Sequence, residues 1–195
     1  MYGALQNLPL SLYRPINPPT IPFIRWSPWD DRVLINENDL FKEYKKIRSP
    51  ARFLVWSLWK FPASRFAGLR IDRLDNDACI VSIPGGWRSQ NPFKSMYWAV
   101  QGMGAELATA GVPLAIVRSI PENVRTLVAG QQSKFIKKAK GRISFTCEDG
   151  HLAMEAIERS MKTGKSVNVD ISATGHDASG DVVSEWIFNW NFLVS

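Results

Sequence analysis

Residues 91–113 read NPFKSMYWAVQGMGAELATAGVP, and this segment predicts one long helix that is apolar along nearly all of its length. Asn91 can cap the helix because its side-chain carbonyl accepts from a free amide of the first turn, and Pro92 fits the first helical position. Gly111 permits a left-handed turn and Pro113 cannot continue a helix, so both indicate its end. We therefore expect a helix of about 19 residues that begins at this first proline.

A rotation of about 100° per residue sorts the side chains of this helix into two unlike faces. The bulky apolar face, which suits packing on a sheet, carries Met96, Val100, Met103 and Leu107, with Tyr97 beside them. The opposite face carries small and polar groups, namely Ser95, Ala99, Gly102, Glu106 and Thr109. Glu106 is the only carboxylate in the helix. Gly102 and Gly104 each cost about 1 kcal/mol relative to alanine inside a helix, which indicates that a ligand or another helix approaches the backbone closely.

Composition places the chain among ordinary folded proteins. Its 195 residues suffice for one domain with a substantial core, and 45% of them are hydrophobic and 22% charged. A formal net charge of +6 allows an anionic partner such as nucleic acid, a phosphorylated cofactor or an acidic membrane surface, and a basic solvated surface also explains it. No nucleic-acid-binding motif accompanies the charge, so nucleic acid is not an expected partner. Cys79 and Cys147 lie in strand-like apolar stretches without CxxC spacing, and we interpret both as reduced core residues.

The N-terminal region predicts an extended arm. Residues 1–35 hold half of the prolines of the chain, and we expect residues 36–195 to form a single domain. Trp26 and Trp29 indicate that the arm packs on its own fold or on a partner subunit. The start of the chain lacks the basic residues and continuous apolar run of a signal peptide, and the longest apolar run, Phe53–Trp59, is too short to span a bilayer. We therefore expect a cytoplasmic protein without a membrane partner.

Helices come first in the domain. Asn36 or Asn38 can cap one helix, and Ser49 with Pro50 can start a second that carries apolar residues toward Phe61. Both helices are amphipathic, and we expect them to cover an apolar surface.

Strands follow, and period-two alternation predicts them. We expect a hairpin within 62–85, a long strand pair made of 128–138 and 140–148, and a shorter helix over 148–161. The last 30 residues alternate most regularly, with GHDASG at 175–180 as their turn. A single apolar helix wrapped by a curved antiparallel sheet is the expected α+β arrangement.

Parts of the sequence also resemble a known superfamily. Residues 91–108, preceded by GLRI at 68–71 and IP at 83–84 and followed by FIKKAKG at 135–141, resemble hotdog-fold proteins. They are most similar to a thioesterase-like branch related to the phenylacetate-pathway acyl-CoA thioesterases, over roughly 51–195. The resemblance implies a homodimer, or a tetramer, whose sheets join edge to edge. Acyl-thioester sites would lie between one subunit's helix and the other subunit, with coenzyme A as part of the substrate and no other cofactor.

The resemblance implies roles for individual residues. In such enzymes an asparagine precedes the helix, amides near the helix N-terminus hold the thioester carbonyl, and a helix carboxylate activates water or attacks. These roles would fall on Asn91, on the amides around Ser95, Met96 and Tyr97, and on Glu106. The His-Gly-Gly that is common before the helix in active relatives is absent, and KSMY at 94–97 stands near its place. The two readings are therefore an acyl-CoA thioesterase and a non-catalytic protein that binds acyl chains or acyl-CoA.

Glu106 is the first candidate for catalysis on physical grounds. A lone carboxylate on a mostly buried helix is costly unless it is paired, hydrogen-bonded or protonated, and burial raises its pKa toward the range useful to a general base. The alternative is a structural acid held by a salt bridge or a backbone amide across the dimer. Helix N-terminal amides suit an oxyanion because they are unpaired donors at the positive end of the helix dipole. Asn91 can cap the helix and line such a site at once.

Other polar residues have weaker claims to a role. Ser95 has no histidine or lysine base at a revealing spacing, so we interpret it as a hydrogen-bonding or packing group rather than a nucleophile. Gln101 either orients a water or faces the partner subunit. His151 and His176 lie away from the helix, which disfavours a hotdog dehydratase, and no cluster has metal-ligand spacing. The predicted substrate-binding residues are Ser95, Met96, Tyr97, Gln101 and Gly102.

A basic cluster follows the expected long strand. Lys137, Lys138, Lys140 and Arg142 could meet the phosphates of coenzyme A, because ammonium and guanidinium groups bind phosphoryl oxygens well. As a solvated strand end, the same cluster needs no ligand.

Overall fold

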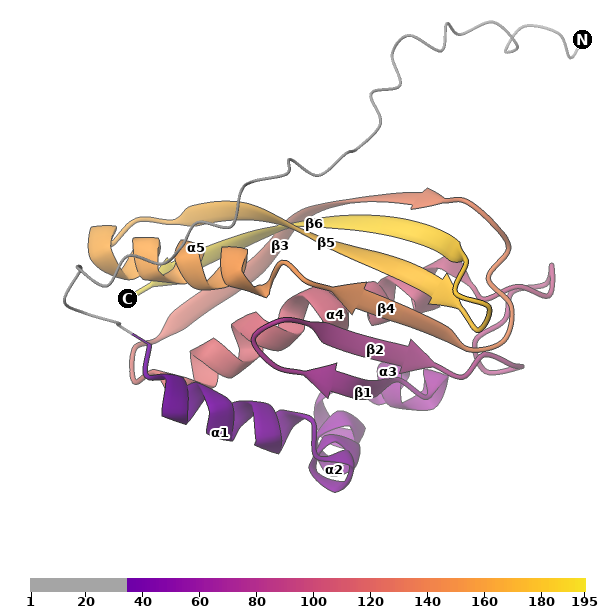
Figure 1. The fold of residues 1–195 in the computed structure, drawn as a ribbon, viewed down its shortest axis with the longest axis horizontal. Coiled ribbons are helices and arrows are strands. Elements are labelled where there is room, and N and C mark those ends of the chain that lie inside the picture. Colours follow the sequence, from indigo (N-terminus) through magenta and orange to yellow (C-terminus); the bar gives the residue numbers. More distant parts are fainter. Residues whose placement is uncertain (1–34) are drawn as a thin grey trace, which may run out of the picture. The chain divides into compact units, whose positions relative to one another are not determined.

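The computed structural model describes residues 35–195, so the predictions for the proline-rich arm lie outside the described residues. Within this part of the chain, helices α1–α3 come first, a hairpin and the long helix α4 follow, and four strands interrupted by α5 complete the fold (Figure 1). The sheet curves around one side of α4, while α1 packs against another side of it. This is the α+β architecture that the sequence predicts.

Six strands form one antiparallel sheet in the order β1-β2-β4-β5-β6-β3. Their bounds are β1 (Arg70–Leu74), β2 (Cys79–Ile83), β3 (Val124–Phe135), β4 (Ile143–Cys147), β5 (Val167–Asp177) and β6 (Val182–Val194). The hairpins β1–β2 and β5–β6 are confirmed. The expected pairing of 128–138 with 140–148 is wrong, because β3 pairs with β6 whereas β4 lies between β2 and β5. Strands β3 and β6 have 12 and 13 residues and pair along nearly their whole lengths, whereas β4 has only five residues.

The long helix α4 covers Trp98–Ser119, which is later than the predicted Pro92–Ala110. Gly111 and Pro113 lie inside it and do not end it. A proline in a helix interior costs about 3 kcal/mol, but the residues around Pro113 are buried against the rest of the fold, and this packing overrides the local preference. The apolar length of α4 would also suffice to cross a membrane, but 67% of its most apolar window is buried inside the protein, as in the core helix of a soluble fold.

Asn91 does not cap α4. The residue at the N-cap position is Tyr97, and no side chain caps the helix there. The Asn91 carboxamide oxygen instead accepts from the backbone amides of Phe93 and Ser95, at 3.0 and 3.2 Å, and so closes a separate turn before the helix. Lys94 in this turn has a φ of 57°. The segment therefore follows the Asx-turn preference of asparagine rather than its capping preference.

The glycines of α4 do meet a close neighbour, but it is neither a ligand nor another helix. A Cβ at Gly104 would lie 2.6 Å from the ring of Phe145 on β4 and 2.9 Å from the Ile83 side chain on β2. A Cβ at Gly111 would lie 2.5 Å from the sulfur of Cys79. The sheet itself therefore occupies the space that the missing side chains leave.

The remaining helices largely follow the sequence. They are α1 (Glu37–Ile47), α2 (Pro50–Lys60), α3 (Pro62–Ala67) and α5 (Gly150–Thr163). The carboxamide oxygen of Asn36 caps α1 by accepting from the Asn38 amide at 2.9 Å, and Gly164 ends α5 in a left-handed conformation with a φ of 64°. The short helix α3 was not predicted. Both cysteines are buried and unpaired, as expected.

Candidate functional site

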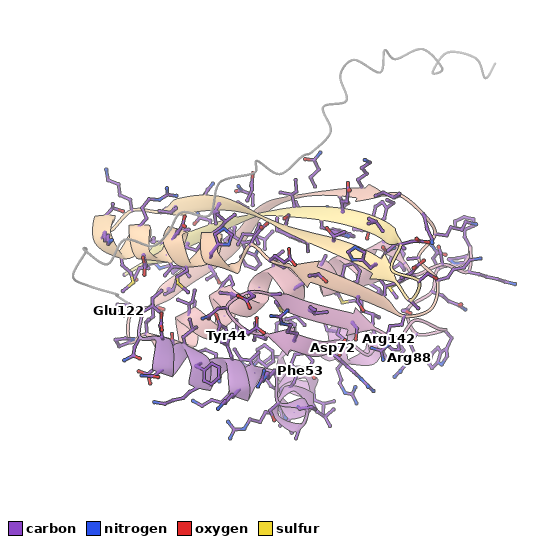
Figure 2. The ribbon with its side chains drawn as sticks, viewed as in Figure 1. Tyr44, Phe53, Asp72, Arg88, Glu122 and Arg142 are labelled. Atoms are coloured by element: carbon purple, nitrogen blue, oxygen red, sulfur yellow. The ribbon has the colours of Figure 1, made fainter. Side chains whose placement is uncertain are left out.

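A cavity of about 400 Å³ lies beside α4, between the segment α2–α3 and the strands β3 and β6. Its size and mostly apolar wall are typical of a small-molecule site. Phe53, labelled in Figure 2, and Trp56 contribute the inner face of α2, and Trp190 contributes the surface of β6. The lining residues are Phe53, Trp56, Phe61, Ser64, Met103, Glu106, Leu107, Ala110, Pro113, Leu114, Val117, Thr126 and Trp190.

Among the described residues 35–195, Glu106 is the only ionisable residue that lines the cavity. Its side chain reaches solvent through the open cavity, but the surrounding protein weakens the solvation of the charge, and this burial raises the pKa of the carboxyl group. Among residues 35–195, no hydrogen bond or ion pair engages the carboxylate. A carboxylate with a raised pKa and no partner, set beside an apolar cavity, has the properties of a general base.

Two hydrogen bonds fix the helix turn that carries Glu106. The indole nitrogen of Trp190 donates to the Thr109 hydroxyl at 3.1 Å, and this hydroxyl donates to the backbone carbonyl of Glu106 at 2.9 Å. At the neighbouring turn, the Ser64 hydroxyl donates to the Met103 sulfur at 3.6 Å. These contacts tie α4 to β6 on one side and to α3 on the other, so they hold both walls of the cavity.

The predicted oxyanion donors are engaged within the chain. The amide of Ser95 donates to the Asn91 side chain at 3.2 Å, that of Met96 to the Ala139 carbonyl at 2.8 Å, and that of Tyr97 to the Ser89 carbonyl at 2.7 Å. The geometry therefore does not support these three amides as free donors to a substrate.

Free donors lie one step further along the chain. Trp98 and Ala99 begin α4, and within the described residues their amides have no acceptor. If α4 presents donors to an oxyanion, these two amides at the positive end of the helix dipole are the ones available.

Gln101 joins the segment before α4 to the helix. Its side-chain nitrogen donates to the Met96 carbonyl at 3.1 Å, while its side-chain oxygen is buried and has no partner within residues 35–195. Gly102 faces the ring of Trp186, which a Cβ would approach to 3.4 Å, an ordinary contact. Neither residue lines the cavity.

The basic cluster is partly neutralised. Lys137 pairs with Asp177 and Asp181 at 2.7 and 2.6 Å, and Arg142 donates to Ser82 at 2.6 Å. Arg142 also lies 3.8 Å from Asp72, and the two are labelled close together in Figure 2. Lys138 and Lys140 are exposed, and they flank Ala139, whose carbonyl accepts from the segment before α4.

The predicted site residues therefore form two groups. Asn91, Ser95, Met96, Tyr97, Gln101 and the basic cluster gather at the start of α4, whereas Glu106 alone lies in the cavity. Glu106 lies eight positions after Trp98 in α4, which corresponds to about 12 Å along the helix axis. One chain does not bring the two groups together.

Sequence reasoning missed most of the cavity wall. The helix of Phe53 and Trp56 was expected to cover an apolar surface, and Trp190 lies in the regularly alternating last strand, but nothing in the sequence predicted that they meet. The expectation that α2 is amphipathic is wrong, because it also exposes Leu58 and Trp59; apolar residues on both faces were the available signal that one face serves something other than the core.

The described part of the chain contains no candidate metal-binding site. Residues 35–195 contain no group of three or more histidine, cysteine, aspartate or glutamate side chains that could hold a metal ion. His151 lies on α5 and His176 on β5, and neither lines the cavity.

Comparison with known proteins identifies the family of this chain and confirms its fold. The family described as "Domain of unknown function (DUF4442)" matches residues 51–192. A Pseudomonas aeruginosa protein described as a probable thioesterase has a TM-score of 0.60 and 18% identity, covering 77% of this chain and 99% of that one. No curated protein matches the chain in sequence.

Two further solved structures agree in fold. A Haemophilus influenzae thioesterase has a TM-score of 0.55 at 11% identity, over 77% of this chain and 94% of its own. A Chlorobaculum tepidum protein of unknown function has a TM-score of 0.63 at 16% identity, over 74% and 94%. The predicted hotdog fold is thereby confirmed, and the chain is similar in structure to proteins described as thioesterases.

Proposed function

Because this chain belongs to the DUF4442 family and has the fold of thioesterase-like hotdog proteins, we propose that it hydrolyses acyl thioesters, with acyl-CoA as the expected substrate class. The observation that carries the proposal is Glu106, the one carboxylate in an otherwise apolar cavity, whose pKa burial raises. Hydrolysis of a thioester needs a base for water and an apolar site for the acyl group, and the cavity offers both.

The wall of the cavity favours an apolar acyl group. Phe53, Trp56 and Leu114 present aromatic and aliphatic surface, and each methylene removed from water contributes about 0.8 kcal/mol to binding. The cavity holds no cation that would bind a carboxylate or phosphate inside it. The charged part of a thioester substrate would therefore remain outside, where Lys138 and Lys140 are exposed.

A homodimer would unite the two groups of candidate residues. Strand β3 is an edge of the sheet, is 12 residues long and has mostly exposed side chains. An uncovered edge of this length can pair with a second copy. In such a dimer, the segment around Asn91 and the first amides of α4 from one subunit would approach Glu106 of the other. The separation of the two groups within one chain supports this arrangement, and a tetramer is the larger alternative.

The proposed reaction uses Glu106 as a general base. The carboxylate takes a proton from a water molecule as the water oxygen attacks the thioester carbonyl carbon. Negative charge then develops on the carbonyl oxygen, where the amides of Trp98 and Ala99 could stabilise it. The carbon–sulfur bond breaks, the thiolate leaves and takes up a proton, and the products are a carboxylic acid and a thiol.

The test is release of free thiol from a panel of acyl-CoA substrates that differ in chain length, recorded with a chromogenic thiol reagent. Thiol release that rises with acyl length supports the proposal. The alternative is a non-catalytic protein that binds acyl chains or acyl-CoA, and the engaged amides of Ser95, Met96 and Tyr97 favour it. Tight binding of acyl-CoA without thiol release would select that alternative.

A further inference from the structure

Helix α2 exposes an apolar face to solvent. Leu54, Val55, Leu58 and Trp59 fall within an arc of about 140° on the helix, and they are 39%, 60%, 56% and 84% exposed. Ser57 is the only buried residue of this helix. In Figure 1, α2 lies at the outer edge of the fold, away from β5 and β6. Contiguous exposed apolar residues of this kind mark an interaction surface.

The chain around this face is strongly basic. Between Glu43 and Asp72 it contains no acidic residue and seven basic ones, which are Lys45, Lys46, Arg48, Arg52, Lys60, Arg65 and Arg70. Arg52 and Lys60 lie on α2 itself, and both are exposed. A helix with tryptophan and leucine on one side and cations around them is typical of segments that lie in the interface of an anionic membrane.

The positive charge on α2 argues against two other partners for its exposed apolar face, namely a second copy of the chain and residues 1–34. A second copy placed face to face would bring the cations of its own α2 against Arg52 and Lys60, because α2 has no acidic residue. Residues 1–34 contain three arginines and two aspartates, so they supply no excess negative charge either. An anionic bilayer satisfies the apolar face and its cations together.

We propose that α2 binds the surface of an anionic phospholipid bilayer, with Leu58 and Trp59 inserted among the lipid headgroups and Arg52 and Lys60 on the lipid phosphates. We expected no membrane partner from the sequence because the longest apolar run, Phe53–Trp59, is too short to span a bilayer, but an interfacial helix does not need to span it. The opposite face of α2 carries Phe53 and Trp56 into the cavity wall. Under the proposed function, this contact places the acyl cavity beside the source of long acyl chains.

The experiment is flotation of the full chain with phosphatidylcholine vesicles, either alone or containing phosphatidylglycerol. A variant with Leu58→Ser and Trp59→Ser removes the apolar contact. Its matched control carries Trp87→Ser and Phe93→Ser, which change two side chains outside α2 that are 75% and 77% exposed. Melting temperatures confirm that both variants fold, and light scattering reports their oligomeric state.

A charge variant tests the cations separately. Arg52→Gln with Lys60→Gln is compared with Lys138→Gln and Lys140→Gln, which change two exposed lysines elsewhere. All of these measurements are made without a thioester substrate, so they stand apart from the test of hydrolysis.

We expect binding to vesicles with phosphatidylglycerol, weaker binding to phosphatidylcholine alone and a loss of binding at high salt. The Leu58 and Trp59 variant should lose about tenfold or more of this binding, and the control should stay within about twofold of the native chain. The proposal is overturned if the native chain does not float with the vesicles. It is also overturned if the Leu58 and Trp59 variant floats as well as the Trp87 and Phe93 control. The proposal is overturned as well if the Leu58 and Trp59 variant still binds vesicles but no longer forms the native oligomer. The exposed face of α2 would then be a contact between copies of the chain.

Discussion

The indole nitrogen of Trp190 on β6 lies 3.1 Å from the Thr109 hydroxyl on α4, and that hydroxyl lies 2.9 Å from the Glu106 carbonyl. Thr109 is 1% exposed, so water does not compete for these bonds. The pair links the sheet to the helix turn that carries the candidate base. The position of the Glu106 backbone therefore depends on Trp190, which lies 81 residues after Thr109 in the sequence.

Thr109→Val should destabilise the fold. Valine keeps the shape of the side chain but leaves the Trp190 N–H buried without an acceptor, which costs about 1–3 kcal/mol in the free energy of unfolding. Urea unfolding followed by fluorescence measures the loss. Thr126→Val is the control, because Thr126 also lines the cavity but is exposed. Equal midpoints for the two variants would show that the Thr109 bond contributes nothing.

Two glycines that lie two residues apart in α4, Gly102 and Gly104, should respond in opposite directions to the same change. A Cβ at Gly104 would lie 2.6 Å from the Phe145 ring, so Gly104→Ala should cost about 1–3 kcal/mol through overpacking. A Cβ at Gly102 would meet Trp186 at 3.4 Å, so Gly102→Ala should gain up to about 1 kcal/mol in helix propensity. The melting temperatures of the two variants, each compared with that of the native chain, test this prediction. A destabilised Gly102→Ala would mean that α4 lies closer to the sheet than described.

Glu43 joins α1 to the C-terminal half of α4. Burial alone would raise the pKa of this carboxyl group, but hydrogen bonds from Lys46 and Arg118 outweigh the burial and hold the pKa below its usual value. The Arg118 side chain approaches to 3.0 Å. A carboxyl group with a lowered folded pKa adds stability above its unfolded pKa, and this stability is lost as the pH falls through the folded pKa.

Glu43→Gln should therefore lower the free energy of unfolding by about 1–2 kcal/mol at neutral pH, a modest value because both cationic partners are half exposed. The difference from the native chain should shrink as the pH falls through the lowered folded pKa of Glu43, because the native carboxyl then also becomes protonated. Urea midpoints across this pH range test the prediction. Asp39→Asn, which changes an exposed pair with Lys42, serves as control and should have little effect.

The proposed dimer can be tested on strand β3. Successive residues of an edge strand direct their backbone N–H groups alternately toward the neighbouring strand and away from it. Of Gln131→Pro and Gln132→Pro, one should break a bond to β6 and lower the melting temperature. The other should leave the fold intact and weaken the dimer, as measured by light scattering at micromolar concentrations. A protein that is monomeric before any substitution would exclude the edge-to-edge dimer.

The regular parts of the fold could be predicted because local patterns specify them. In β6, alternate residues from Ser184 to Val194 are buried as the period-two pattern predicts, and Gly164 ends α5. The end of α4 could not be predicted, because Gly111 and Pro113 are stop signals locally and only contacts with distant strands override them. The partner of β3 is β6, which lies far away in the sequence, and no local pattern reveals such a pairing.

The candidate site was predictable to a similar degree. Glu106 stood out as the one carboxylate of an apolar helix, and the structure places it in the cavity. The aromatic wall could not be predicted, since Phe53 and Trp190 come from opposite ends of the domain and meet only after folding. Asn91 shows the limit of motif reasoning: its side chain suits a helix cap, but the chain uses it to close the turn before the helix.

Glu106→Gln separates catalysis from structure. The change keeps the shape of the side chain but removes the proton acceptor, so thiol release should fall about 10²-fold or more. Because burial raises the pKa of Glu106, the activity of the native chain should decline with falling pH from a point above the usual 4.5 of a glutamate. An acid with a raised folded pKa stabilises the fold when protonated and loses this contribution as the pH rises. The glutamine variant should therefore melt at or above the native temperature at pH 8, whereas Glu155→Gln, on the exposed face of α5, should change neither activity nor melting. A glutamine variant that melts lower and still releases thiol at the native rate would make Glu106 a structural acid and remove the base from the proposed mechanism.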